Sequence, residues 1–286
     1  SHALMRECQA HLDDTKAWKV CAAAKSCTKR QEALEAQNMK LLDAARAFAS
    51  TRKLEPQTLV DKLAKLKFAK REFKSQGMGD QTKSLECSPQ SVLVGYGGRA
   101  VPSEVFAMFS HTTNLDTLGL VKDLWTECKK HCKDLCATSM SINKGQFQLH
   151  KDTNNIGDSW IITFGDYEGG DLWVHKHGFL NPKNALLRFD GKYHHCTTPF
   201  TGTRFSVVFY TDRRWAPGNF DMQRYLSAST GWVFPSAKWE HEARHRKYEE
   251  ITWQEAYQDY LAACTERGTA APAELDAEVE YLHSTI

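Results

Sequence analysis

Two separate segments of the chain carry side chains that could bind a metal ion. In the first, His150 and Asp152 are separated by one residue, Lys151. Alternate side chains of an extended strand point to the same face, so this imidazole and carboxylate would lie together, with Phe147 and Leu149 on the other face. They are two of the three ligands of the 2-His-1-carboxylate triad, which holds Fe(II) and leaves further coordination positions open. Because a lone His-x-Asp pair is common by chance, a third ligand is needed.

The second segment, residues 190–206, supplies candidates for that third ligand. His194 and His195 are adjacent and would face opposite sides of a strand, so at most one of them can join the first pair. We favour His195, because the positions of the following Pro199-Phe200 and Gly202-x-Arg204 are spaced from His195 rather than from His194. His194 is then a polar neighbour.

An anion-binding group follows in the same segment. Arg204 begins an apolar strand in which Ser206 shares its face. A buried guanidinium needs an anion, because taking an unpaired charge out of water is costly. A bidentate arginine beside a hydroxyl suits the distal carboxylate of a small diacid. Arg188, on a neighbouring expected strand, is the alternative for this role.

Two further groups consist of residue types that bind metals. His175 and His177 would share one face of a strand, and they are either spare metal ligands or an exposed pair. Cys128, Cys132 and Cys136 recur every four residues in a helical context, which does not match the Cys-x-x-Cys spacing of zinc sites. Ordinary buried thiols are the simpler interpretation of these cysteines.

The central part of the chain must position these groups, and its pattern favours short strands. Runs rich in β-branched and aromatic residues occur at residues 92–96, 139–149, 159–165, 171–175, 185–189 and 205–211. A helical insert at roughly 103–135 interrupts the series. Since no βαβ alternation is present, the pattern predicts a sandwich or jelly roll rather than a parallel sheet.

The two ends of the chain favour helix instead. The N-terminal part is rich in Ala, Lys, Leu and Glu, and Pro56 fits a helix start. The basic run 62–74 is either a solvated helix face or a surface that contacts phosphates. Thr252 and Glu255 predict a capping box, followed by a helix with an aromatic packing stripe. We therefore divide the chain into an N-terminal helical, basic region (1–86), a core with a helical insert (87–235), and a C-terminal helical segment with an acidic tail (236–286).

Composition narrows the class of protein. The 41% of apolar residues suffice for a packed core and are too many for a disordered chain. No apolar run approaches the roughly 18 residues of a membrane helix, so we expect no membrane association. Nine cysteines without a secretory signal predict a reducing, intracellular compartment. The formal net charge of +2 neither requires nor excludes a nucleic-acid partner.

Taken together, these motifs resemble those of the Fe(II)/2-oxoglutarate dioxygenases. The matching residues are His150-x-Asp152, the distal His195, and Arg204-x-Ser206. Within that superfamily the chain is most similar to the TET/JBP-type nucleobase oxygenases and their algal, protist and fungal relatives, on the basis of Asn155 and the strand around Gly169-Gly170. The resemblance covers about residues 92–211 and neither helical arm.

The resemblance implies an enzyme with a double-stranded β-helix (jelly-roll) core flanked by helices, in the α+β class. Iron would be bound by His150, Asp152 and His195, and the tail carboxylate of 2-oxoglutarate by Arg204 and Ser206. Asn155 would hydrogen-bond the edge of a flipped-out cytosine. The implied reaction oxidises the methyl group of 5-methylcytosine in DNA, with ascorbate as an alternative co-substrate used by some algal relatives.

Other functions stay open at this point. The substrate could instead be an RNA base, a protein side chain or a small molecule. The chain could also be a non-catalytic nucleic-acid-binding module, which predicts neither iron binding nor 2-oxoglutarate turnover. For the favoured function we expect a nuclear protein that acts on DNA as a monomer.

Overall fold

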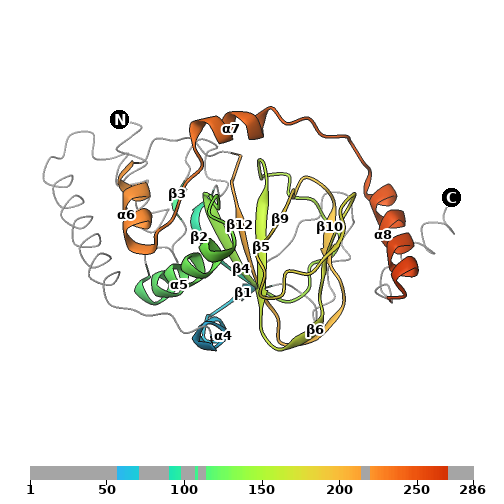
Figure 1. Ribbon diagram of the computed structural model, residues 1–286, viewed down its shortest axis with the longest axis horizontal. Helices are drawn as coiled ribbons and strands as arrows, with labels where there is room; N and C mark the ends of the chain where they lie inside the picture. The colour runs from blue at the N-terminus through green and yellow to red at the C-terminus, as the bar shows by residue number, and fades with distance from the viewer. Residues whose placement is uncertain (1–56, 71–89, 98–106, 109–113, 214–219, 270–286) are drawn as a thin grey trace, which may run out of the picture.

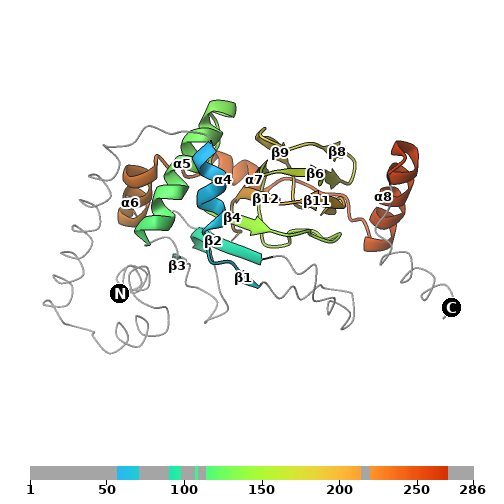
Figure 2. The same cartoon turned by 90° about the horizontal axis from the view of Figure 1, so that it is seen from below.

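The computed structural model describes residues 57–70, 90–97, 107–108, 114–213 and 220–269. Figures 1 and 2 show the described elements as successive layers: a group of helices, a larger sheet, a smaller sheet, and the helix α8 (Trp253–Arg267) at the far end. Side chains of both sheets meet in one apolar cluster, which includes Ile161, Leu172, Val174 and Phe189. The two sheets therefore face each other and enclose an interior.

The larger sheet is antiparallel and contains the longest strands. Its order is β1-β2-β4-β12-β5-β9, and β3 pairs with β2. Its strands are β1 (Ala69–Lys70), β2 (Gln90–Gly97), β3 (Ala107–Met108), β4 (Ser139–Lys144), β5 (Ser159–Phe164), β9 (Leu187–Phe189) and β12 (Phe205–Tyr210). Because β12 pairs with both β4 and β5, the last strand of the core lies between two of the earlier ones.

The smaller sheet has the order β10-β7-β8, and an isolated bridge between His150 and His195 extends it. Its strands are β7 (Leu172–Val174), β8 (Gly178–Leu180) and β10 (His195–Thr197), and a separate ladder joins β6 (Tyr167–Gly169) to β11 (Phe200–Gly202). From β4 to β12 the chain passes back and forth between the two sheets, with the β7–β8 hairpin as its turning point. This path is that of a double-stranded β-helix, so the predicted jelly-roll core and α+β class are confirmed.

Side-chain alternation along β12 gives the larger sheet two different faces. Its outward residues lie in the main hydrophobic cluster with the helices, and they are Phe205, Val207 and Phe209. Val208 packs instead with the cluster between the sheets. Arg204 and Ser206 alternate with the outward set, and they therefore face the enclosed interior, as their spacing predicts.

Three helices cover the outer face of the larger sheet: α4 (Gln57–Ala64), α5 (Leu115–His131) and α6 (Phe220–Thr230). α5 begins after Asn114, whose Oδ1 accepts hydrogen bonds from the backbone N–H groups of Asp116 and Thr117, both at 3.0 Å. An ion pair between Lys62 and Asp123 joins α4 to α5. None of the helices in the described ranges is both long and apolar enough to cross a membrane.

The C-terminal elements wrap around the core. α7 (Ala237–Arg244) is followed by an extended segment, residues 245–252, which we call the strap, and then by α8. Figure 1 shows the strap running along one edge of the sheets toward α8. The predicted capping box of Thr252 and Glu255 is confirmed, and the predicted packing stripe places Tyr257 and Tyr260 against the outer face of the smaller sheet.

The helical prediction for the N-terminal part holds only in part. Most of residues 1–86 and of the acidic tail lie outside the described residues. Helix α4 begins directly after Pro56, but it ends at Ala64 because the following chain packs on the sheet, where Phe68 stacks on Phe205 with ring centroids 6.0 Å apart. The basic run 62–74 is therefore not one continuous helical face. Within the predicted insert 103–135, residues 107–108 are strand β3 rather than helix.

Candidate metal centre

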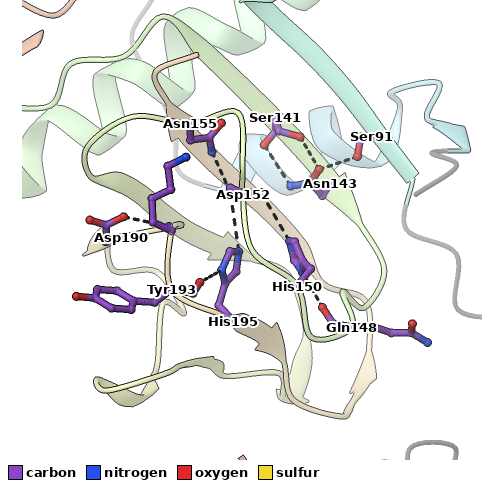
Figure 3. A network of polar contacts seen from close by, with 11 residues as sticks. Ser91, Ser141, Asn143, Gln148, His150, Asp152, Asn155, Asp190, Tyr193 and His195 are labelled. Carbon is purple, nitrogen blue, oxygen red and sulfur yellow. Dashed lines mark hydrogen bonds and ion pairs between the residues drawn. The ribbon is translucent and has the colours of Figure 1, made fainter. Parts of the chain in front are cut away.

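Three side chains predicted as ligands come together at one edge of the smaller sheet. One ligand atom from each of His150, Asp152 and His195 lies within 4.8 Å of the other two. Nε2 of His150 is 3.8 Å from Oδ1 of Asp152, and Nε2 of His195 is 3.9 Å from Oδ2. Figure 3 shows the two imidazoles turned toward the carboxylate between them. These separations exceed hydrogen-bond length, so the three groups do not satisfy one another directly.

Backbone pairing brings the distant ligands together. The N–H of His195 donates to the carbonyl of His150 at 2.8 Å, and the N–H of His150 donates back at 3.1 Å. Residues opposite each other in such a pair project to the same side, and the two imidazole centroids are 4.4 Å apart. The N–H of Asp152 donates to the carbonyl of Gly191 at 2.7 Å. The turn before β10 therefore aligns Asp152 as well.

Both imidazoles are held in one tautomer. Nδ1 of His150 lies 2.6 Å from the carbonyl of Gln148, and Nδ1 of His195 lies 2.9 Å from the carbonyl of Tyr193. A carbonyl only accepts, so each Nδ1 carries a proton, and each Nε2 is the ring nitrogen left to face the centre. Two imidazole Nε2 atoms and a carboxylate form the donor set of non-haem Fe(II) oxygenases, so these residues fit a ferrous ion.

His194 does not join this group. Burial lowers the pKa of its imidazole to about 4, with smaller contributions from Lys151, His175 and His150. Its backbone carbonyl accepts a hydrogen bond from the N–H of His175 at 2.9 Å. The structure thus brings His195, rather than its neighbour, to His150 and Asp152.

Asn155 contacts the carboxylate of Asp152, one of the candidate ligands. It is buried, and its Nδ2 donates to Oδ2 of Asp152 at 2.9 Å (Figure 3). Gly191 lies on another side of the same carboxylate, where an added Cβ would come within 2.9 Å of Oδ2. Asp152 is therefore flanked by an amide and by a glycine, where a larger residue would press on its carboxylate. The sequence pattern indicated neither contact.

The enclosed interior contains the guanidinium of Arg204. This residue is only 2% exposed, and its Nε and Nη2 have no hydrogen-bond partner among the described residues. Its Cζ lies 5.7 Å from the ring centroid of Tyr167 and 5.6 Å from that of Phe200. Burial lowers the pKa of Arg204, and Tyr167 and Asp171 oppose this shift. A charged group with two unused donors in such a place fits a small anion.

Arg188, the alternative for the same role, lies elsewhere. It pairs with Trp160 across β9 and β5, and Trp160 faces the helix side of the sheet. Its side chain is 69% exposed and approaches Asp158 at 3.6 Å. The geometry therefore favours Arg204 as the residue that binds an anion inside the core.

A polar network lines the interior beside Arg204, and the sequence analysis missed it. Asn143 Nδ2 donates to Oγ of Ser206 at 3.3 Å, while its Oδ1 accepts from Ser91 at 2.7 Å and from Ser141 at 2.6 Å (Figure 3). Ser91 on β2 and Ser206 on β12 lie opposite Asn143 of β4 in register, and Ser141 is two residues before Asn143 on the same strand. Strand pairing is needed to bring Ser91 and Ser206 to Asn143, because they are far from it in the sequence.

The other predicted metal candidates do not gather in the described part of the chain, where one metal-type group is found. Nδ1 of His175 lies 3.1 Å from Oδ2 of Asp259 on α8, so this histidine faces the helix. Cys128 and Cys136 are buried free thiols whose pKa values are raised by burial, that of Cys136 to about 11. All three cysteines, with Cys132 only partly buried, are thus free thiols in this structure.

Comparisons with known proteins give structural neighbours only. No protein-family model and no curated protein matches the sequence. One similar structure is an oxidoreductase of the 2OG-Fe(II) oxygenase family from Burkholderia pseudomallei, with 15% identity and a TM-score of 0.37, over 54% of this chain and 77% of that one. Another is a prolyl hydroxylase from Trichoplax adhaerens in complex with a hypoxia-inducible-factor peptide, with 10% identity and a TM-score of 0.30, over 70% of this chain and 96% of that one.

Proposed function

We propose that this protein is an Fe(II)- and 2-oxoglutarate-dependent dioxygenase. The observation that carries the proposal is the convergence of His150, Asp152 and His195 at the edge of a double-stranded β-helix that also buries an arginine with two unused donors. The first three residues supply a metal site, and Arg204 supplies a site for an anion in the same enclosed space. Neither a purely structural metal site nor a simple binding module requires this second group.

The chain's own residues bind and orient the two groups. His150, Asp152 and His195 hold Fe(II), with Asn155 fixing the carboxylate by its second oxygen. When bound, Fe(II) with 2-oxoglutarate uses O2 to oxidise a substrate C–H bond and releases succinate and CO2. The protein contributes a fixed set of ligands and a partly dry interior.

Arg204 and Ser206 are suited to the distal carboxylate of the keto acid. The amide of Asn143 donates to the Ser206 hydroxyl and is itself oriented by two other hydroxyls, so the proton of Ser206 is free to point away from Asn143. Nε and Nη2 of Arg204 remain as further donors. Three donors without internal acceptors match a carboxylate. This donor set favours 2-oxoglutarate over ascorbate, which lacks a distal carboxylate.

For the substrate we propose a methylated pyrimidine in nucleic acid, most simply 5-methylcytosine in DNA. Three basic residues belong to or contact the loop 151–155 at the candidate centre: Lys151 lies in it, Nζ of Lys192 donates to the Thr153 carbonyl at 2.8 Å, and the backbone N–H of Arg213 donates to the Asn154 carbonyl at 2.7 Å. Burial lowers the pKa of Lys192, and the nearby charges of Arg213 and Lys151 lower it further.

These three cations form no ion pair with any described residue, so phosphates would be suitable partners. A base would have to leave the duplex to reach the metal. The side-chain oxygen Oδ1 of Asn155, which accepts no hydrogen bond from a described residue, is suited to accept one from the edge of the flipped base. A nuclear location and a monomeric state follow from this substrate as predictions.

The test is an incubation of methylated and unmethylated DNA and RNA with the protein and Fe(II), with 2-oxoglutarate and ascorbate supplied separately. Succinate and modified nucleosides are measured by mass spectrometry. Succinate without a modified nucleoside would keep the dioxygenase and move the substrate to a protein side chain or small molecule. No succinate and no metal binding in a titration would leave only a non-catalytic module. If DNA is the substrate, Arg213→Ala should reduce the slope of log affinity against log salt by about 1.

A further inference from the structure

The turn formed by residues 190–193 lies against two of the three metal-binding side chains. The Gly191 carbonyl accepts from the N–H of Asp152 at 2.7 Å, and the Tyr193 carbonyl accepts from Nδ1 of His195 at 2.9 Å. The position of this turn therefore sets the positions of both Asp152 and His195.

The carboxylate of Asp190 fixes the turn from within. Its Oδ1 accepts from the backbone N–H of Lys192 at 3.0 Å, and its backbone carbonyl accepts from the N–H of Tyr193 at 3.2 Å. The side chain is only 7% exposed, and a carboxylate buried to this extent needs partners for its other oxygen.

Two residues of the strap supply those partners. Nη1 of Arg246 donates to Oδ2 of Asp190 at 2.6 Å, and the hydroxyl of Tyr248 donates to the same oxygen at 2.9 Å. Nη1 of Arg246 also reaches Oδ1 of Asp158 at 2.5 Å, just before β5. The guanidinium of Arg246 thus connects the 190–193 turn to the start of strand β5 in the larger sheet. The ring of Tyr248 packs edge-on against Tyr193, with centroids 6.1 Å apart.

We propose that Arg246 and Tyr248 are positioning residues of the metal centre. Through Asp190 the strap holds the 190–193 turn, and through the turn it holds Asp152 and His195 in the arrangement that binds the metal. The inference rests on the proposed function, because it assumes that these ligands hold a metal ion. Both residues act through others, and they lie 56 and 58 positions from Asp190, so no local motif indicates them.

The experiment compares Co(II) binding to the full chain and to three variants, followed by visible absorption. Arg246→Ala is expected to raise the dissociation constant for Co(II) about 10- to 100-fold and to change the absorption bands of the bound ion. Tyr248→Phe, which removes one hydrogen bond and keeps the ring, is expected to raise the dissociation constant by a factor of about three to ten. Glu249→Gln is the matched control, since Glu249 lies on the same strap but pairs with the exposed Lys176. Its binding and spectrum should equal those of the unmodified protein.

The outcomes distinguish a failure of the proposed function from a failure of the positioning role. If the unmodified protein binds no Co(II), the proposed function fails. If it binds Co(II) and the folded variants Arg246→Ala and Tyr248→Phe match Glu249→Gln in affinity and spectrum, the strap is only structural and the positioning role is overturned. Circular dichroism checks the folding of each variant. Should Arg246→Ala fail to fold, Tyr248→Phe decides, because it deletes a single hydroxyl.

Discussion

Replacing Arg204 with methionine is expected to change heat stability and co-substrate affinity in opposite directions. The residue is 2% exposed, and its Nε and Nη2 find no hydrogen-bond partner among the described residues. Without 2-oxoglutarate, the protein therefore keeps a positive charge in its interior that is poorly compensated. Methionine has a similar length and fills the space between the rings of Tyr167 and Phe200 without a charge.

The two effects can be estimated separately. Replacing a buried ion pair by apolar side chains is often neutral or stabilises a protein by about 1–4 kcal/mol, and we expect the same sign for a buried guanidinium with two unused donors. Since Arg204 also loses its cation–π contacts, we expect the lower end, or a rise in Tm of about 2–4 °C. Removing one partner of a buried, hydrogen-bonded charge pair costs about 2–5 kcal/mol, which corresponds to roughly 30- to 5,000-fold weaker binding of 2-oxoglutarate.

Calorimetry measures both quantities on the same samples. Scanning calorimetry without ligand gives Tm, and titration with 2-oxoglutarate in the presence of Mn(II) gives the dissociation constant. Arg188→Met is the control, because Arg188 is exposed on the outer face of the sheet and should leave the affinity unchanged. Unchanged affinity in Arg204→Met would refute the anion site. A ligand-free variant that unfolds several degrees lower would show that the guanidinium has a structural partner instead.

Three further predictions concern the metal centre. His150→Ala and Asp152→Ala should abolish 2-oxoglutarate turnover while preserving the circular dichroism spectrum, because both side chains lie at the rim of the core; turnover in either variant would contradict the ligand assignment. Gly191→Ala should weaken Co(II) binding about tenfold or more in a spectroscopic titration, because its Cβ would press on Oδ2 of Asp152; unchanged binding would mean that the carboxylate can move. Asn155→Ala should lower uncoupled decarboxylation, because its amide holds Asp152, and should lower methylcytosine oxidation further, because its Oδ1 is proposed to accept from the base; equal loss of both would remove the base-reading role.

The parts of the site that depend on strand alternation could be predicted from the sequence. His150-x-Asp152 and Arg204-x-Ser206 each require only that alternate residues share a face, and this rule holds wherever a segment is extended. The long strands β4, β5 and β12 were recognised for the same reason. Of the three-residue strands, β7 and β9 lie within the predicted runs 171–175 and 185–189, whereas β8, β10 and β11 were not recognised. Pairing with distant partners, rather than local sequence, determines the latter.

What the sequence could not supply is the set of contacts across strands. Asn143 orients Ser206 only because β4 and β12 pair in that register, and Ser91 joins them from a third strand. The contact of Arg246 with Asp190 likewise depends on the path of the strap. In each case a polar residue in an otherwise ordinary position acquires a role through a partner that is far away in the chain.

The exposure of the ligands determines the side from which a substrate can reach the metal. The side chains of His150 and Asp152 are 26% and 31% exposed, whereas that of His195 is 6% exposed and lies against Phe189, with ring centroids 5.2 Å apart. A substrate must therefore approach over the loop 151–155 and not over β10. Helix α8 packs on the outer face of the smaller sheet, so it cannot contact the reacting bond. Among the described residues, we therefore expect that loop and the basic residues that contact it to contribute to discrimination between a nucleobase, a peptide and a small molecule. In the proposed arrangement the strap and the 190–193 turn act instead on metal affinity.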